Sequence, residues 1–340
     1  MINLQSHYSL KNHNTFGVDV SADLFVSVDS VKELREAVAI AREKNLPLMI
    51  LGGGSNILFT QDFAGLVAAV KLKGITTETV NENEVLVSAS AGENWHGFVE
   101  FCLEQNFGGL ENLSLIPGNV GTAPMQNIGA YGTEIKDTLE RCKVYNLEND
   151  LIEYFSAEQC RFGYRESVFK REAKGKYVIL EVTFRLTRRD HQIKTEYGAI
   201  KDVLKKSGIE NPTIQQVAAA VITIRKSKLP DPKELGNAGS FFKNPSIPQK
   251  QFIELQRRYP KIPFYPAGEL VKIPAGWLME QSGWKGKQVG NVASHHQQSL
   301  VLINKTGLAT GQEILAFSTM VINSIKEKFG ITLEREVNIL

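Results

Sequence analysis

The first part of the chain arranges apolar residues as a strand and then as one stripe of a helix. Phe25 to Val28 predicts a short strand. Ser30 and Glu33 have the spacing of a capping box, which predicts that a helix begins there. Asn45 and Pro47 predict the end of that helix. Between them the apolar residues recur at helical spacing, as Val31, Leu34, Val38 and Ala41.

A second apolar run, Leu48 to Leu51, predicts the next strand and ends in Gly52-Gly53-Gly54-Ser55-Asn56. Glycine lets backbone N–H groups approach a ligand without a Cβ in the way. The run is not a P-loop, because no Lys-Ser or Lys-Thr follows it, and Ile57 occupies the place of the third glycine of a Rossmann fingerprint. A tight turn is one interpretation, whereas Ser55 and Asn56 add donors suited to a pyrophosphate.

The rest of the chain predicts further strands and helices around a polar insertion. Thr187–Pro212 is polar and charged, and we expect an inserted segment or mobile loop there. Pro230-Asp231-Pro232 marks a boundary. The predicted strands are 67–72, a half-buried strand through Val85, Val87 and Ala89, 177–186 and 331–340. The predicted helices are 95–105, 217–226 and 310–329, the last capped by Thr310 and Glu313 and ended by Gly330.

A longer glycine-containing segment, Glu111 to Gly132, carries almost no charge after its first residue. Two ordinary turns would account for its glycines, but Gln126 and Asn127 would need partners if buried. A flat, hydrogen-bonding cofactor ring would supply them. Together with Gly52–Asn56, the segment predicts one large, phosphate-containing cofactor held by main chain, and that cofactor would carry the chemistry.

Three other motifs hold candidate reactive groups. Ser240 stands between glycine and two phenylalanines without a Gly-x-Ser-x-Gly elbow, so it is either a turn serine or a proton donor. Arg161 and Arg165 stand among aromatic residues, either in a surface strip or facing a ligand carboxylate. Leu333–Val337 alternates charged and apolar residues, as a strand with one solvated face does.

Composition narrows the function classes. The chain has 340 residues, 42% hydrophobic and 22% charged, which is ordinary for a soluble globular protein. A net charge of +2 gives no support for a nucleic-acid partner. Three cysteines without metal-like spacing predict free thiols, and adjacent His295 and His296 do not predict a metal site. The polar start of the chain and the absence of a long apolar run predict a cytoplasmic protein without signal peptide or membrane helix.

The ordered set of motifs resembles the UDP-N-acetylenolpyruvoylglucosamine reductases, FAD enzymes of bacterial peptidoglycan precursor synthesis. The segment Thr187–Pro212 with Tyr197 resembles the type I form, whose tyrosine loop closes over substrate. The matching residues span nearly the whole chain: Asn14-Thr15-Phe16, Gly52–Asn56, Ile116–Gly132, Tyr164-Arg165, Lys228-Leu229-Pro230, Gly239–Pro245 and Leu333–Val337.

The resemblance implies an α+β chain with a vanillyl-alcohol-oxidase-type FAD-binding fold in two subdomains plus an α/β substrate-binding subdomain. The implied boundaries are 1–74, with 331–340 as a candidate addition, then 75–229 including the tyrosine loop 187–212, and 230–329. NADPH would reduce a non-covalently bound FAD, since neither glycine segment contains a His or Cys to tether it. The enolpyruvyl ether of UDP-N-acetylglucosamine enolpyruvate would then be reduced to UDP-N-acetylmuramate.

The resemblance also implies roles for single residues. Hydride would add to the methylene carbon, and Ser240 would protonate the adjacent carbon, assisted by a water relay or a nearby lysine. Arg165 and Glu336 would flank the substrate carboxylate. Substrate binding is implied for Tyr164, Tyr197, Lys228, Asn244 and Gln298. Cofactor binding is implied for Gly52, Gly53, Gly54, Ser55, Asn56, Pro117, Gly118, Gly121, Ala123, Gln126, Asn127, Gly129 and Tyr131.

Two other functions stay open at this point. One is an FAD oxidase or dehydrogenase of the same fold that acts on a sugar or alcohol. The other is a non-catalytic flavin-binding or UDP-sugar-binding protein, which would not need Ser240, Arg165 and Glu336 together. For the reductase we expect a small-molecule UDP-sugar substrate, a monomer, and no metal, nucleic-acid, membrane or obligate protein partner.

Overall fold

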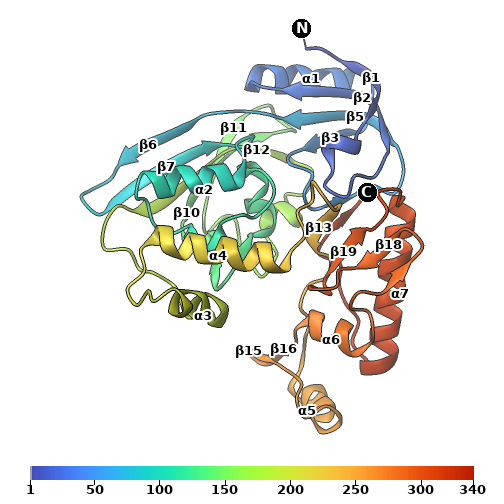
Figure 1. The fold of residues 1–340 in the computed structure, drawn as a ribbon. Coiled ribbons are helices and arrows are strands. Elements are labelled where there is room, and N and C mark those ends of the chain that lie inside the picture. Colours follow the sequence, from blue (N-terminus) through green and yellow to red (C-terminus); the bar gives the residue numbers. More distant parts are fainter. Residues whose placement is uncertain (1) are drawn as a thin grey trace. The chain divides into compact units, whose positions relative to one another are not determined.

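The computed structural model describes residues 2–340 and divides the chain into two compact units (Figure 1). The chain passes from one unit to the other inside the first glycine run, between Gly53 and Gly54. Helices and sheets occur in both units, as the predicted α+β class requires. The first unit comprises Met1–Tyr8, Ala22–Gly53 and Phe63–Ser227, and the second comprises Ser9–Ser21, Gly54–Asp62 and Lys228–Leu340.

Two sheets and a hairpin form the β structure of the first unit. The strands are β1 (Gln5–Ser9), β2 (Ser21–Val28), β3 (Leu48–Leu51), β5 (Phe63–Val70), β6 (Ile75–Thr79), β7 (Glu84–Ser90), β8 (Gly129–Ala130), β9 (Thr133–Glu134), β10 (Leu139–Asn146), β11 (Ile152–Ser156) and β12 (Tyr177–Thr187). One sheet has the order β1-β2-β5-β3, with β2 and β3 parallel to β5. The other is antiparallel, with the order β11-β10-β12-β7-β6, and β8 pairs with β9.

Helix α1 (Val31–Glu43) covers the parallel sheet, and its cap differs in one contact from the predicted capping box. The Ser30 hydroxyl accepts the Glu33 N–H at 3.2 Å, as predicted. The Glu33 carboxylate, however, accepts the N–H of Asp29 at 2.7 Å, one residue before the cap. The predicted strand 25–28 also begins earlier, at Ser21, because β2 pairs with β5 along most of its length.

Helix α2 (Trp95–Glu104) packs on the antiparallel sheet, where Val85, Val87 and Ala89 are buried in alternation as predicted (Figure 1). Two further helices, α3 (Gly198–Lys206) and α4 (Ile214–Lys228), pack against each other. The polar insertion, whose composition tolerates a helix, does contain one, namely α3. Its helix α3 buries Ile200 and Leu204 in a small apolar cluster that it shares with α4.

The second unit contains short strands and three helices. The strands are β4 (Ile57–Leu58), β13 (Asn237–Ser240), β14 (Ser246–Pro248), β15 (Tyr265–Ala267), β16 (Leu270–Lys272), β17 (Gln288–Val289), β18 (Val292–Ser294), β19 (Val301–Asn304) and β20 (Asn338–Ile339). The helices are α5 (Gln249–Arg258), α6 (Ala275–Gln281) and α7 (Gly311–Phe329). Its sheets have the orders β13-β19-β18-β17, β14-β16-β15 and β20-β4.

Helix α7 confirms its predicted ends, because Thr310 and Glu313 form the complete capping box and Gly330 leaves the helix with φ 68°. The predicted strand 331–340 is wrong for most of its length, since only Asn338–Ile339 forms β20, which runs parallel to β4. None of the helices in residues 2–340 combines the length and the apolar character that a bilayer crossing requires. Short 3₁₀ helices lie at Lys11–His13, Glu111–Leu113, Val120–Thr122, Pro124–Gln126, Ile135–Asp137 and Val168–Lys170.

Candidate functional site

The first glycine run packs directly against the second glycine segment. A Cβ on Gly52 would lie 2.4 Å from Cγ2 of Thr122, and one on Gly53 would lie 2.9 Å from Cα of Gly118. Side chains at these two positions would force the segments apart. The sequence suggested that these glycines admit a ligand, and the structure adds that they allow the two segments to meet.

Three backbone N–H groups at this junction are available to a ligand. Those of Gly53, Gly118 and Asn119 donate no hydrogen bond to any group within residues 2–340, although all three residues are partly buried. Neighbouring backbone N–H groups that lack a protein partner can together bind an anion. The residues therefore fit the pyrophosphate of a dinucleotide such as FAD.

The remainder of the first glycine run belongs to the second unit. Gly54 has φ 63°, and a Cβ there would lie 2.0 Å from the carbonyl oxygen of His13, so only glycine fits. Asn56 donates through Nδ2 to the Glu336 carbonyl at 3.2 Å and accepts the Asn338 N–H at 3.1 Å. The end of the predicted cofactor loop is thus bonded to the segment of the predicted catalytic glutamate.

The second glycine segment contains an unusual density of left-handed backbone. Leu115, Asn127 and Tyr131 have φ values of 59°, 46° and 50°. Each such non-glycine residue costs about 1–3 kcal/mol and persists only where its surroundings hold it. Gly121 allows close packing, since a Cβ there would lie 2.4 Å from that of Ala91. Of the other predicted cofactor residues here, Ala123 is buried, Gly129 is half-buried and Pro117 is exposed.

The prediction that Asn127 needs a ligand to satisfy its amide is wrong. Its side chain is fully buried, and Nδ2 donates to Glu134 at 2.8 Å and to the Gly163 carbonyl at 3.0 Å. Its Oδ1 accepts the Lys136 N–H at 3.1 Å. Asn127 therefore joins the glycine segment to the loop before Arg165. The neighbouring Gln126 amide accepts from Lys170 at 3.4 Å.

Arg165 is attached to the same glycine segment. Its Nη2 donates to the Gly129 carbonyl at 2.8 Å, and its guanidinium lies 5.6 Å from the ring centroid of Tyr164. Arg165 itself has a left-handed backbone, with φ 55°. The structure thus brings Arg165 and Tyr164 to Gly129, while Arg161 forms an exposed ion pair with Glu172 and lies outside this group.

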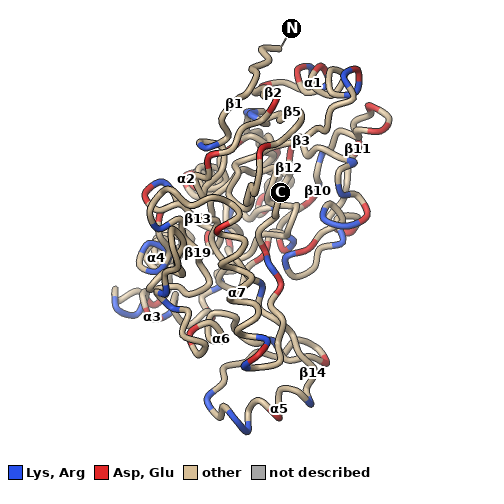
Figure 2. Tube along the Cα trace, turned by 90° about the vertical axis from the view of Figure 1, so that its right-hand side faces the viewer, with Lys and Arg blue, Asp and Glu red and all other residues tan. Residues whose placement is uncertain are grey.

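The tyrosine of the insertion contacts the glycine segment as well. Tyr197 is half exposed and meets Tyr131 edge to face, with ring centroids 5.3 Å apart. Asn112 strengthens the connection, because its Nδ2 donates to the carbonyl oxygens of Tyr131 and Lys194, both at 3.0 Å. Burial raises the pKa of Tyr131. Figure 2 shows basic residues along α3, the helix that Tyr197 begins.

In the second unit, Ser240 and Glu336 are brought together by backbone pairing. The Glu336 N–H donates to the Phe241 carbonyl at 2.8 Å, and Phe242 bridges to Arg335. Ser240 ends β13 and is exposed, whereas Phe241 and Phe242 are buried. The two phenylalanines therefore hold the serine at the surface beside the segment that contains Glu336.

Two predicted substrate residues meet at the start of α6. The Asn244 Oδ1 accepts the Ala275 N–H at 2.9 Å, and Oε1 of Gln298 would lie 3.6 Å from a Cβ on Gly276. Lys228 is exposed at the end of α4. Lys243, which precedes Asn244, is buried and pairs with Glu334 at 2.5 Å.

Comparisons with known proteins identify the family of this chain. Residues 231–340 match the C-terminal domain model of UDP-N-acetylenolpyruvoylglucosamine reductase, and residues 22–153 match an FAD binding domain. The reductase of Flavobacterium johnsoniae is 51% identical over 338 residues, which are 99% of each chain. That of Pseudomonas aeruginosa is 44% identical over 339 residues, again 99% of each chain. The chain belongs to the UDP-N-acetylenolpyruvoylglucosamine reductase family.

The fold is shared with a solved member of this reductase family. The crystal structure of the Thermus caldophilus reductase matches with a TM-score of 0.66 and 22% identity, covering 100% of this chain and 98% of that one. This match confirms the predicted fold class. The FAD binding domain and the named relatives confirm the FAD cofactor and the enzyme class.

Several residues that build the site were missed in the sequence. Asn119 offers an N–H at the glycine junction, and Asn112 connects Tyr131 to the insertion. Arg225 of α4 donates to the Leu115 carbonyl at 3.2 Å, and His96 of α2 accepts the Leu115 N–H at 3.1 Å. Arg225 stands beside the apolar stripe of α4 and is half-buried. A charged residue at such a position was the sequence feature from which its contact with Leu115 could have been predicted.

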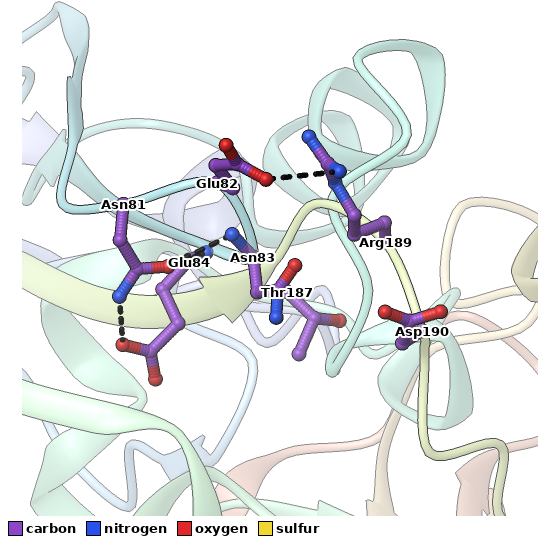
Figure 3. A pocket seen from close by; sticks show the side chains of 7 residues that line it. All are labelled: Asn81, Glu82, Asn83, Glu84, Thr187, Arg189 and Asp190. Carbon is purple, nitrogen blue, oxygen red and sulfur yellow. Dashed lines mark hydrogen bonds and ion pairs between the residues drawn. The ribbon is translucent and has the colours of Figure 1, made fainter.

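A separate surface hollow of about 490 Å³ lies away from these residues. It is lined by Asn81, Glu82, Asn83, Glu84, Thr187, Arg189 and Asp190, none of which is a predicted site residue (Figure 3). Glu82 and Arg189 pair across it at 3.4 Å, and both are largely exposed. This hollow has none of the features of a reductase site.

Metal ligands and reactive thiols are not part of the described site. Within residues 2–340, no three His, Cys, Asp or Glu side chains are placed to hold a metal ion. Cys102, Cys142 and Cys160 are buried free thiols, and burial raises the pKa of Cys102 and Cys142.

Proposed function

We propose that this chain reduces the enolpyruvyl ether of UDP-N-acetylglucosamine enolpyruvate to UDP-N-acetylmuramate, with NADPH as the reductant. The observation that carries the proposal is the junction of Gly53 with Gly118 and Asn119, in a chain 51% identical to a named reductase over nearly its whole length. When bound, FAD supplies a carrier that takes hydride from NADPH and gives it to the substrate.

The cofactor is proposed to bind non-covalently in the glycine segments. The N–H groups of Gly53, Gly118 and Asn119 are suited to its pyrophosphate. The left-handed turns at Asn127 and Tyr131 give the second segment a fixed shape before the cofactor binds. The predicted subdomains 1–74 and 75–229 would contribute this binding, and 230–329 the substrate contacts.

Ser240 is the proposed proton donor to the carbon next to the substrate carboxylate. Its exposure at the end of β13, with Phe241 and Phe242 fixed in the core, supports this role. A serine hydroxyl is a weak acid, so a neighbouring group must stabilise the charge that develops on its oxygen. Glu336 is bonded through its N–H to Phe241, next to the serine, but its carboxylate would oppose this negative charge. The assisting group is therefore proposed to be a water relay or a nearby lysine.

Arg165 is proposed to stabilise negative charge that develops toward the substrate carboxylate. A guanidinium fork matches a carboxylate in charge and in geometry. Its hydrogen bond to the Gly129 carbonyl and its contact with the Tyr164 ring orient the guanidinium. Both partners are uncharged, so the positive charge of Arg165 is not neutralised by them. Contacts with the diphosphate and sugar are proposed for Tyr164, Tyr197, Lys228, Asn244 and Gln298.

We also propose that the enzyme is a cytoplasmic monomer, because its substrate is a charged, soluble sugar nucleotide. Sedimentation of the holoenzyme at several concentrations tests the oligomeric state, and fractionation of the source cell tests the location. A concentration-dependent dimer or a membrane-bound fraction would contradict these two points.

An anaerobic pair of half-reactions tests the reductase function. NADPH should bleach the flavin of the purified protein, and the enolpyruvyl sugar nucleotide should restore its colour without oxygen. Reoxidation only by oxygen, with a sugar or alcohol as the reducing substrate, would identify an oxidase instead. A flavin that responds to neither reagent would indicate a binding protein.

A further inference from the structure

Leu115 lies within the second glycine segment, two residues before Pro117, in a conformation that leucine rarely adopts. Its φ is 59°, and Ile116 is followed by Pro117, a residue that restricts the backbone on both sides. The chain therefore has little freedom between Leu115 and Gly118. Whatever holds Leu115 sets the direction in which Pro117–Asn119 enters the glycine junction.

Two side chains from different helices hold the backbone of Leu115. His96 of α2 accepts its N–H at Nδ1, at 3.1 Å, and Arg225 of α4 donates from Nε to its carbonyl oxygen, at 3.2 Å. Arg225 also interacts with the side chain of Tyr131 at the other end of the segment. We call His96 and Arg225 the Leu115 clamp.

The clamp requires a neutral histidine ring. Because Nδ1 accepts a hydrogen bond, the ring proton is on Nε2, which lies 3.5 Å from Oε1 of Glu100. The charged groups that face this ring are Glu100, Arg225 and Lys226. Burial lowers the pKa of His96, the two cations lower it further, and Glu100 opposes them.

We propose that His96 is a positioning residue for the cofactor, holding Leu115 and thereby Pro117–Asn119 only while its ring is uncharged. Protonation would set an Nδ1–H against the Leu115 N–H, so the hydrogen bond would be lost. The inference rests on the proposed function in one respect, namely that FAD is the ligand of this segment. Its consequence is that FAD is released as the pH falls.

The binding of FAD is linked to the protonation of His96, and this linkage sets how FAD affinity changes with pH. Cofactor binding favours the neutral ring, so the dissociation constant for FAD rises as the pH falls through the pKa of His96, which lies below its ordinary value. The rise is at most about tenfold per pH unit, because one proton is involved. At higher pH the dissociation constant is independent of this residue's titration.

The experiment measures FAD released from the holoenzyme by ultrafiltration, between about pH 5 and about pH 8. His96→Asn keeps an acceptor oxygen where Nδ1 stood and cannot titrate, so it should retain FAD with a flat profile across this range. His96→Leu removes the acceptor and should release more FAD at every pH. The control His7→Asn, at an exposed residue of β1, should keep the wild-type profile.

Two charge variants test the assignment to His96 without touching the ring. Glu100→Gln removes the anion that supports protonation, so the midpoint of release should move to lower pH. Lys226→Gln removes a cation, so the midpoint should move to higher pH. Both shifts should be smaller than about one pH unit, because Glu100 and Lys226 are exposed.

Three outcomes distinguish a failure of the proposed His96 role from a failure of the proposed reductase function. A wild-type holoenzyme that retains FAD equally at all pH values overturns the inference and leaves the reductase function standing. A wild-type profile in His96→Asn does the same. Purified protein that holds no FAD at any pH overturns the proposed function, and the inference with it.

Discussion

Ser240 is the residue on which the proposed chemistry depends most directly. It is exposed, while its two neighbours on the C-terminal side are buried and its strand pairs with β19. A serine of an ordinary turn needs no such support. The proton-transfer role therefore predicts that a change at Ser240 slows only the half-reaction in which the substrate reoxidises the flavin.

Ser240→Ala should leave FAD content and flavin reduction by NADPH unchanged, and slow reoxidation by the enolpyruvyl substrate. General acid catalysis is worth about 10²–10⁴-fold, so anaerobic stopped-flow should show a loss of at least that order. Ser240→Cys should retain part of the rate, because a thiol also carries a proton. The control Ser246→Ala changes an exposed serine of β14 and should react normally. Normal reoxidation of Ser240→Ala would leave Glu336 or a bound water as the acid.

Gly53 is the residue that most directly tests the cofactor junction. A Cβ there would lie 2.9 Å from Cα of Gly118, and both atoms are backbone-fixed. Gly53→Ala should weaken FAD binding about tenfold or more, since overpacking costs about 1–3 kcal/mol, and Gly53→Leu should yield colourless protein. The matched control Gly97→Ala meets no atom closer than 3.7 Å and should bind FAD as the wild type does. Flavin that stays on the polypeptide after acid precipitation would contradict non-covalent binding.

At the scale of elements, the insertion combines an anchored helix with a polar connection. Helix α3 buries Ile200 and Leu204, whereas 188–197 is mostly exposed and contacts the glycine segment through Tyr197 and the Lys194 carbonyl. Lys194 also pairs with Asp137 at 2.9 Å, and Ile193 packs against the cluster of α3 and α4, but these contacts are weak compared with an apolar core. The connection, more than the helix, is the part expected to move when substrate binds.

Hydrogen exchange across 188–197 should slow when the UDP-sugar substrate is added, with a smaller change in α3. Tyr197→Phe should raise the substrate dissociation constant by about ten- to a hundredfold, the value of a hydrogen bond to a charged group, and should leave FAD content unchanged. Tyr154→Phe, at another exposed tyrosine, is the control. Equal exchange with and without substrate would show that this connection does not close.

At the scale of the whole molecule, features that depend on neighbouring residues could be predicted from the sequence. Features that depend on a partner distant in sequence could not. Helices α1 and α7 carry their own caps and apolar stripes, so their bounds followed from sequence. The strand predicted for 331–340 shrank to Asn338–Ile339, because strand formation depends on a partner distant in sequence. Asn127 was assigned to a ligand for the same reason. Its hydrogen-bond partners, Glu134 and Gly163, lie beside it only in the folded chain.

The pairing of β20 with β4 has a consequence for how the protein folds. Asn56 of the first glycine run bonds to Asn338, and Leu58 and Thr60 bond to Leu340, about 280 residues further along the chain. Contacts between residues so distant in sequence carry a high entropy of loop closure and form slowly. The first glycine run therefore reaches its final arrangement only when these distant parts of the chain have met.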